Sequence, residues 1–216
     1  MVAALWGVDS AARVTETIYE CVRRNYGVPA YWGRYLTTVP GAADGLTTNE
    51  ISFLHRKGIK ILPVYSAFRR AVGFANGQIV ARNTLFHARR LRIPRGTVIF
   101  ANVERFFEVD EGWIRGWVNT FLPSGYRPGI YHDPVTGNFN AAFCAAAARD
   151  PMVSRRAILW SAEPDPGVTS KQKAPPFAPT KVNCPANVLI WQYGRDSQTC
   201  PIDTNLLDSS MYRYLW

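Results

Sequence analysis

Eight short apolar runs alternate with amphipathic segments along this chain, and this alternation limits the possible folds more than any other feature. The apolar runs cover residues 5–9, 31–36, 60–66, 97–104, 127–133, 157–163, 188–194 and 201–205. The amphipathic segments between them cover residues 14–26, 47–57, 76–92, 110–121 and 138–149. Alternating strands and helices are typical of parallel strands that are joined by helical crossovers.

Eight such runs predict an α/β fold, a modified TIM-type (β/α) barrel with eight strands, although a doubly wound sheet has the same local pattern. At 216 residues the chain lies near the lower limit for a barrel. Six prolines crowd residues 164–185, where no helix is evident, so we expect an irregular, helix-poor C-terminal third. No linker divides the chain, which predicts a single barrel domain over residues 1–216.

The composition excludes several classes of protein. With 47% hydrophobic and 13% aromatic residues, the chain is too apolar to remain disordered. No apolar stretch approaches the ~18 residues that a membrane span needs. The net charge of +9 would attract the chain to polyanions, but its Lys and Arg residues are scattered and do not alternate with aromatic residues. We therefore do not expect nucleic acid as a partner.

The four cysteines contain no C-x-x-C pair, which argues against a zinc site. Cys184 and Cys200 flank one strand-like run, so a disulfide between them could close a loop late in the chain. Cys21 and Cys144 lie in helix-like segments and are expected to be free, buried apolar residues.

Polar and aromatic residues gather at the ends of the apolar runs. In a parallel barrel all strand C-termini open onto one face, where the active site lies. Asp9, Glu104 and Asp203 come from the first, fourth and eighth runs, so their carboxylates are predicted to converge at one mouth. Residues two apart on a strand share a side, which places Asn102 beside Glu104. The same mouth is expected to be ringed by Tyr65, Tyr131, Trp160, Trp191 and Tyr193.

Convergent carboxylates beside aromatic rings are what the cleavage of glycosidic bonds requires. One carboxyl group must be protonated so that the leaving oxygen can depart, and a second negative group must stabilise or attack the cationic sugar, or activate water. The alternative is structural: Asp9 and Asp203 would cap loops, and Glu104 would pair with an arginine. Their equivalent positions at three strand ends favour the catalytic interpretation.

Other chemistries have weaker signals. The histidines lack the spacing of metal ligands, although His132, at a strand end, could touch a ligand. No serine has the G-x-S-x-G context of a hydrolase nucleophile, and Gly-rich phosphate loops are absent. We therefore expect neither a metal nor a cofactor.

Several motifs resemble a known family. Gly7-Val8-Asp9-Ser10, Asn102-Val103-Glu104, Gly129-Ile130-Tyr131, Trp191-Gln192-Tyr193 and Ile202-Asp203-Thr204-Asn205 resemble family 25 glycoside hydrolases, the N-acetylmuramidases or lysozymes. A related glycoside-hydrolase-like family, domain of unknown function 1906, is more similar still. Its motifs correspond here to Gly7-Val8-Asp9, Arg34-Tyr35-Leu36, Leu46-Thr47-Thr48-Asn49-Glu50, and the run from Gly58 through Pro63 to Tyr65.

The resemblance implies a glycan hydrolase that acts on peptidoglycan or a similar β-linked amino-sugar polymer. Glu104 would be the general acid, while Asp9 and Asp203 would shape the sugar site and tune its charge. It further implies an extracellular or cell-envelope location, and we expect a monomer. The segment 1–5 is too short for the hydrophobic region of a signal peptide, so export would need a signal outside this sequence.

Position 102 departs from the lysozyme pattern, which has Asp-x-Glu where this chain has Asn102-Val103-Glu104. An amide can orient an N-acetyl group but carries no negative charge. Either Asp9 or Asp203 supplies that charge, or the enzyme is slow, or the chain is a non-catalytic carbohydrate-binding or cell-envelope domain on a degenerate glycosidase barrel. A polyanion-binding protein with a vestigial pocket is a third hypothesis.

Overall fold

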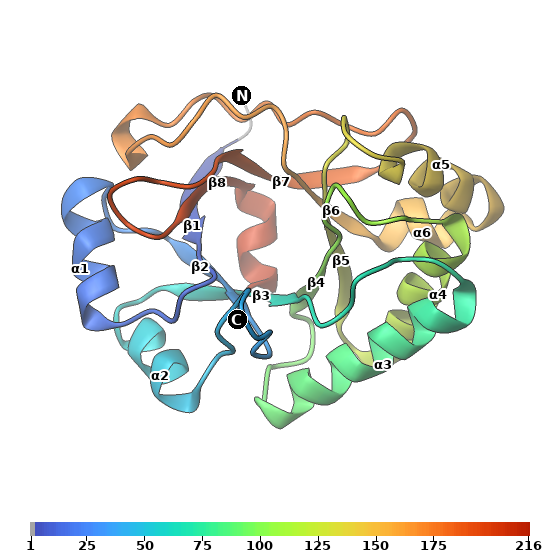
Figure 1. Ribbon diagram of the computed structural model, residues 1–216, viewed down its shortest axis with the longest axis horizontal. Helices are drawn as coiled ribbons and strands as arrows, with labels where there is room; N and C mark the ends of the chain where they lie inside the picture. Colours follow the sequence, from blue (N-terminus) through green and yellow to red (C-terminus); the bar gives the residue numbers. More distant parts are fainter. Residues whose placement is uncertain (1–2) are drawn as a thin grey trace.

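The eight strands close into a barrel in which each strand pairs with its neighbours in chain order (Figure 1). The computed structural model describes residues 3–216. The first two residues of the predicted domain, which also begin the segment compared with a signal peptide, lie outside the described residues. The predicted eight-stranded α/β barrel is confirmed, with strands β1 (Ala4–Asp9), β2 (Tyr31–Tyr35), β3 (Lys60–Tyr65), β4 (Val98–Asn102), β5 (Arg127–His132), β6 (Ile158–Ser161), β7 (Asn187–Gly194) and β8 (Asp203–Asp208).

Helices surround most of the barrel (Figure 1). They are α1 (Glu16–Asn25), α2 (Thr48–Arg56), α3 (Phe74–Arg90), α4 (Glu111–Phe121), α5 (Phe139–Arg149) and α6 (Pro151–Arg156). Thr15, Thr47 and Asp110 cap three of them by accepting a backbone N–H in the first turn. Helix α6, which begins at Pro151, was not predicted. As predicted, the segment between β6 and β7 contains no α-helix, only a 3₁₀ turn at Lys171–Lys173.

The last strand, β8, runs in the opposite direction to the other seven strands. Strands β1 to β7 are parallel, whereas β8 is antiparallel to both β7 and β1. The expectation that all eight strands end at the mouth is therefore wrong for β8, which begins there. The short loop of residues 195–202 explains this reversal, because it leaves no room for a helical crossover between β7 and β8.

The residues inside the barrel form an apolar plug below the mouth. Alternate residues of the strands point inward, and the inner cluster includes Tyr31, Leu62, Phe100, Ile190 and Leu207. Glycines make room for the large rings, since a Cβ at position 7 would lie 2.5 Å from the Tyr31 ring and one at position 129 would lie 2.6 Å from the Phe100 ring. The C-terminal 3₁₀ turn Ser209–Tyr214 adds Met211 to this cluster. The inner cluster therefore fills the barrel below the strand ends.

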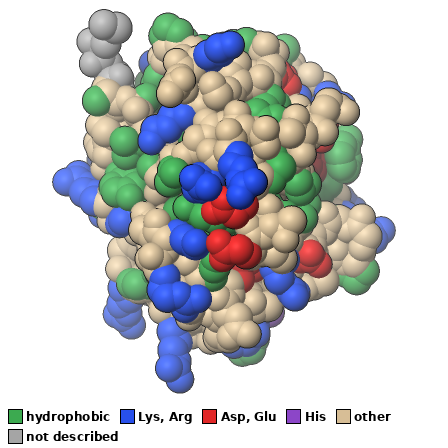
Figure 2. All heavy atoms as spheres, turned by 90° about the vertical axis from the view of Figure 1, so that its left-hand side faces the viewer, with side chains coloured by type: hydrophobic (Ala, Val, Ile, Leu, Met, Phe, Trp, Pro, Cys, Tyr) green, Lys and Arg blue, Asp and Glu red, His purple; other side chains and the backbone are tan. Residues whose placement is uncertain are grey.

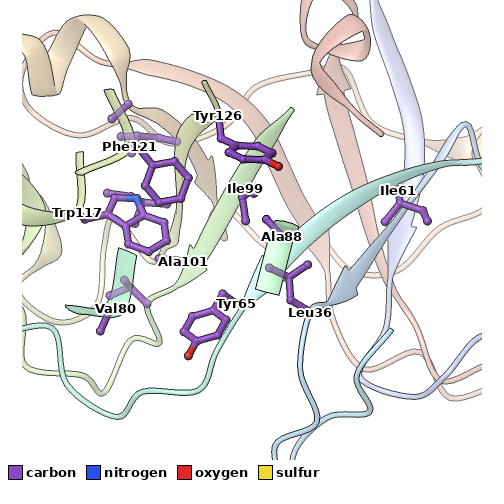
Figure 3. Packing of buried hydrophobic residues seen from close by; sticks show 14 of the residues in the cluster. Leu36, Ile61, Tyr65, Val80, Ala88, Ile99, Ala101, Trp117, Phe121 and Tyr126 are labelled. Atoms are coloured by element: carbon purple, nitrogen blue, oxygen red, sulfur yellow. The ribbon is translucent and has the colours of Figure 1, made fainter. Parts of the chain in front are cut away.

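A second, larger cluster lies between the barrel and the helices (Figure 3). It receives the strand residues that point outward, such as Ile61, Ile99 and Ala101, and the helix residues Val80 and Trp117. Both faces of each strand are thus packed, as expected for a barrel wrapped by helices.

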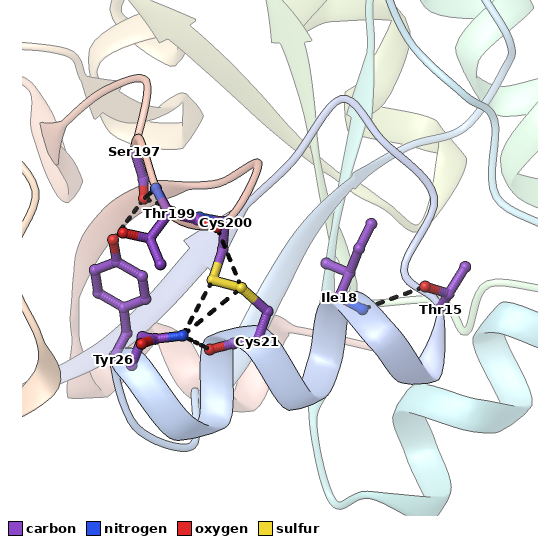
Figure 4. Close-up of a disulfide and its surroundings, with 8 residues drawn as sticks. Thr15, Ile18, Cys21, Tyr26, Ser197, Thr199 and Cys200 are labelled. Atoms are coloured by element: carbon purple, nitrogen blue, oxygen red, sulfur yellow. Dashed lines mark hydrogen bonds between the residues drawn. A yellow bond between two sulfur atoms is a disulfide. The ribbon is translucent and has the colours of Figure 1, made fainter.

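Two disulfides join distant segments, and neither is the predicted Cys184–Cys200 bridge. Cys21 of α1 pairs with Cys200, and Cys144 of α5 pairs with Cys184. The prediction failed because it judged proximity along the chain, whereas closure of the barrel brings α1 beside the loop between β7 and β8 (Figure 4). Cys21 and Cys144 are consequently not free.

Basic side chains are dispersed over the face that carries α1 and α2 rather than gathered into one patch (Figure 2). This agrees with the scattered Lys and Arg residues of the sequence. Among residues 3–216, no helix is long and apolar enough to cross a bilayer.

Candidate active site

A cavity of about 170 Å³ opens at the barrel mouth, above the inner apolar cluster. The polar and aromatic side chains of seven different strands or strand ends surround it. Its lining comprises Asp9, Tyr35, Val64, Asn102, Glu104, Tyr131, Trp160, Gln192, Arg195, Asp196 and Asp203. The three predicted carboxylates therefore share one cavity, together with the predicted Asn102, Tyr131 and Trp160.

Strand register brings Asp9 and Asp203 together. Asp9 is the last residue of β1 and lies directly opposite Asp203, the first residue of antiparallel β8. Both side chains point inward because their strands present alternate residues to the interior. Space for the Asp9 carboxylate depends on Gly33 of the adjacent strand β2, where a Cβ would lie 2.6 Å from the Asp9 Cβ.

Gln192 of β7 links these two carboxylates. Its Nε2 donates hydrogen bonds of 3.1 Å to Asp9 Oδ2 and 3.1 Å to Asp203 Oδ2, while its Oε1 accepts one of 2.7 Å from the Tyr131 hydroxyl. Asn205 Nδ2 donates a further bond of 2.6 Å to Asp9 Oδ2. The network holds Asp9 and Asp203 in fixed positions at the base of the cavity.

Glu104 lies at the rim of the cavity, two residues beyond the end of β4. It is half-buried, and its Oε1 accepts a hydrogen bond of 2.9 Å from Asn102 Nδ2. The Asn102 side chain therefore orients the carboxyl group of Glu104. This confirms the predicted proximity of the two side chains.

Burial changes the protonation of the aspartate pair. Removal from water raises the pKa of Asp9 to about 6, against the lowering effect of hydrogen bonds from Asn205 and Gln192. Removal from water, together with the nearby charge of Asp9, raises the pKa of Asp203 to about 8. Two interacting carboxyl groups of this kind titrate as a pair, so the pair retains a proton near neutral pH.

Three of the predicted ring residues do not reach the mouth. Tyr65 points away from the barrel and stacks on Phe68 and His87, with ring centroids 6.4 and 5.9 Å apart (Figure 3). Trp191 and Tyr193 belong to the same outer cluster. On β7 only one of two neighbouring residues can face inward, and the register of the barrel selects Gln192.

These outward residues have structural partners. Trp191 Nε1 donates to the Pro164 carbonyl at 2.7 Å, and the Tyr193 hydroxyl accepts from Trp6 Nε1 at 2.9 Å. His132 also points outward, where its ring packs against Phe139 at 4.2 Å. The expectation that His132 could touch a ligand at the mouth is therefore wrong.

Five residues near the mouth were not predicted as site residues: Tyr35, Gln192, Arg195, Asp196 and Asn205. Tyr35, Gln192 and Asn205 do belong to the motifs that carried the family resemblance. The period-two pattern could have identified Asn205, which must share a side with Asp203. Arg195 and Asp196 lie in the loop after β7, where no periodic signal exists. Within residues 3–216, no group of three or more His, Cys, Asp or Glu side chains is arranged to hold a metal ion.

The central cavity adjoins two further pockets, and we call the three together the groove. On one side lies a pocket of about 370 Å³, which shares Glu104, Tyr131, Arg195 and Asp196 with the cavity and adds Phe106. On the other side lies a pocket of about 380 Å³, which shares Asp9, Asp196 and Asp203 with it. The mouth can therefore accommodate an extended molecule rather than a single small ring.

A buried ion pair positions the loops at one end of this groove. Arg34 Nε donates to Glu50 Oε1 at 2.6 Å, and its other nitrogens donate to the carbonyls of Ser10 and Asp44 at 2.5 and 2.9 Å. Arg34 and Glu50 belong to the motifs that carried the family resemblance. Their role in this structure is to hold the loops after β1 and β2.

The chain is similar to known proteins at two levels. A model of the Rv2525c-like, glycoside hydrolase-like domain matches residues 27–200. The crystal structure of an uncharacterized B. stearothermophilus protein is 53% identical, with a TM-score of 0.97, and the match covers 98% of this chain and 100% of that chain. The comparison with curated proteins gave no match.

More distant structures share the fold. The catalytic domain of endolysin ply40 from bacteriophage P40 of Listeria monocytogenes is 15% identical, with a TM-score of 0.62 and coverage of 99% of this chain and 96% of that chain. A family GH25 lysozyme from Aspergillus fumigatus is 13% identical, with a TM-score of 0.57 and coverage of 98% and 97%. At these identities the similarity shows the fold alone. The match over residues 27–200 shows the family: this chain belongs to the Rv2525c-like glycoside hydrolase-like domain family.

Proposed function

We propose that this protein hydrolyses β-linked amino-sugar polymers such as peptidoglycan, with Glu104 as the general acid. The observation that carries the proposal is the arrangement at the mouth, where Glu104 stands at the rim of a groove and the Asp9–Asp203 pair lies at its base. Membership in a glycoside hydrolase-like family and a fold shared with lysozymes support the same chemistry.

In this proposal Glu104 donates a proton to the leaving oxygen. Its half-buried side chain is common to the central cavity and to the pocket that contains Phe106, so a glycan in the groove would cross it. As the bond between the anomeric carbon and the bridging oxygen breaks, that oxygen takes the proton of Glu104. Water then adds to the anomeric carbon and returns a proton to the Glu104 carboxylate.

The groove suits a polymer. Sugar rings present apolar faces, and the half-buried Tyr131 lines the cavity, with the buried Trp160 behind it at a centroid distance of 5.1 Å. Polar groups beside these rings can bind hydroxyl and N-acetyl groups. The net charge of +9 would keep the protein close to an anionic cell wall, in an extracellular or cell-envelope setting.

The direct test measures the release of reducing ends from several types of peptidoglycan. Substituting Glu104→Gln removes the proton donor but keeps the shape of the side chain, and we expect activity to fall by about 10²–10⁴-fold. Glu108→Gln is the matched control, because Glu108 is an exposed carboxylate in the same loop that pairs with Arg70 on the surface. It should retain full activity.

Equal activity of the wild type and the Glu104→Gln variant would contradict the proposal. Calorimetric titration with muro- and chito-oligosaccharides tests the alternative that the chain is a carbohydrate-binding domain without catalysis. That alternative predicts binding by both proteins and product from neither.

A further inference from the structure

The loop between β7 and β8, residues 195–202, lies at the mouth and is held there by a disulfide and by hydrogen bonds. The Cys21–Cys200 disulfide ties its end to α1, and the Ser197 hydroxyl forms a hydrogen bond of 2.6 Å with the Tyr26 hydroxyl (Figure 4). Within the loop, Ser197 N donates to the Ile202 carbonyl at 3.1 Å. Because both α1 and β8 hold this loop, its conformation is set before any ligand binds.

Asp196 is the residue of this loop that has a positive φ angle. Its φ angle is +56°, in the left-handed region that residues other than glycine, asparagine and aspartate rarely adopt. Its backbone N–H donates a hydrogen bond of 2.7 Å to Asp203 Oδ1. A non-glycine residue held in this region by its surroundings is often found at functional sites.

The side chain of Asp196 lies where the three parts of the groove meet. It lines the central cavity and both neighbouring pockets. It is exposed, and among residues 3–216 no hydrogen bond or ion pair engages its carboxylate. The structure therefore leaves the Asp196 carboxyl group without a protein partner where the three pockets meet.

A mechanism of the lysozyme type needs a second negatively charged group at this site. The lysozyme pattern has two acidic residues where this chain has Asn102 and Glu104, and Asn102 is neutral. Asp9 is buried, Asp203 is half-buried, and Gln192 links the two carboxyl groups. Because both pKa values are raised, the pair retains one proton near neutral pH and carries one negative charge rather than two.

This inference rests on the proposed function and deepens it. We propose that Asp196 provides the negative charge that Asn102 lacks and stabilises the positively charged sugar that forms in the groove. When the bond between the anomeric carbon and the bridging oxygen breaks, its electron pair leaves with the oxygen, which Glu104 protonates. The positive charge then rests on the anomeric carbon and the ring oxygen. Asp196 acts by electrostatic attraction and forms no covalent bond.

The first test is binding, which needs no turnover. We expect Asp196→Asn to weaken binding of an oligosaccharide that ends in a protonated iminosugar by more than tenfold in calorimetric titration. Binding of the neutral N-acetylglucosamine oligomer of the same length should change by less than twofold. Asparagine tolerates the left-handed conformation, so this variant keeps the loop. Equal weakening for both ligands, or no weakening, would overturn the proposal.

The second test is rescue of activity. Asp196→Asn should lower kcat by about 10²-fold with little change in KM, the loss expected when one preorganised electrostatic group is removed. Adding Asn102→Asp to that variant returns a carboxylate to the cavity, and kcat of the double variant should be at least tenfold higher than kcat of Asp196→Asn alone. A purely structural role of Asp196 would allow no such rescue.

These outcomes separate the two proposals. If Glu104→Gln abolishes product release while Asp196→Asn retains the wild-type kcat, the role of Asp196 is refuted and the proposed function stands. If the wild type releases no product, the proposed function fails, and the iminosugar titration still decides whether Asp196 is a charge-recognition site.

Discussion

The barrel interior has two layers, a lower one of apolar side chains and an upper one of polar side chains. In the lower layer Tyr31, Leu62, Phe100 and Leu207 pack against one another without any hydrogen-bonded network. In the upper layer, nearer the mouth, the same strands and their neighbours present polar residues: Asp9, Asn102, Gln192, Asp203 and Asn205.

The difference separates stability from chemistry. Apolar side chains in the lower layer gain free energy by leaving water, whereas each buried polar group of the upper layer requires a hydrogen-bond partner to offset the cost of its burial. The upper layer meets this requirement through the Gln192 and Asn205 side chains, yet the aspartate pair still has raised pKa values. The lower layer thus supports a site whose two carboxyl groups make the fold less stable at neutral pH than at acid pH.

The largest expected effect comes from the lower layer. Phe100→Ala empties a fully buried position whose ring lies against Gly129 and contacts Trp160 edge-on at 5.6 Å. We expect the free energy of unfolding to fall by about 3–5 kcal/mol, measured by chemical denaturation.

Phe86→Ala is the control for this substitution, because Phe86 of α3 is 61% exposed. Its effect should stay within about 0.5 kcal/mol. If Phe100→Ala cost no more than Phe86→Ala, the lower layer would not be the main source of stability that we infer.

The intermediate effect is a pH dependence in the upper layer. Because the folded state holds the proton of Asp203 more tightly than the unfolded chain does, stability should fall as pH rises toward the folded pKa of about 8. The slope is at most about 1.4 kcal/mol per pH unit for each such proton. Removing the titrating group with Asp203→Asn should flatten the curve, as measured by unfolding at pH 6.5 to 8.

A second buried group has its main effect at lower pH. Burial lowers the pKa of His132 to about 3 from an ordinary value of 6.5, so its contribution to the slope fades as pH rises above 6.5 and is the same in the wild type and in Asp203→Asn. Asp208→Asn, at the other end of β8, is the control and should keep the wild-type slope. An unchanged slope in Asp203→Asn would mean that this carboxyl group is ionised throughout.

The smallest expected effect concerns the rim of the groove. Phe106 is 78% exposed, follows Glu104 by two residues and lines the pocket of about 370 Å³. An exposed ring in this position can stack on a sugar. Phe106→Ala should raise KM for polymeric substrate by about 3–10-fold with little change in kcat, since such stacking contributes about 0.5–1.5 kcal/mol.

Stability should be nearly unchanged in the Phe106→Ala variant, and Phe106→Trp should retain the wild-type KM. A fall in kcat without a change in KM would place Phe106 outside the binding surface. Phe86→Ala again serves as the control for a lost exposed ring.

Much of the fold follows from local patterns in the sequence. Eight short apolar runs identified all eight strands, because strands packed on both faces are apolar along most of their length. Strand ends also identified Asp9, Asn102, Glu104 and Asp203 as neighbours, because the geometry of a barrel brings equivalent ends to one mouth.

The tertiary structure decided what depends on register and on loops. The strand-end pattern placed Trp191 and Tyr193 at the mouth, but pairing of β7 with β6 and β8 turns Gln192 inward and both rings outward. Likewise, the reversal of β8 and the Cys21–Cys200 bridge carry no local signal, yet together they place Asp196 over the mouth. Local periodicity is written into neighbouring residues, whereas register, loop position and disulfide pairing arise only when distant segments close the barrel.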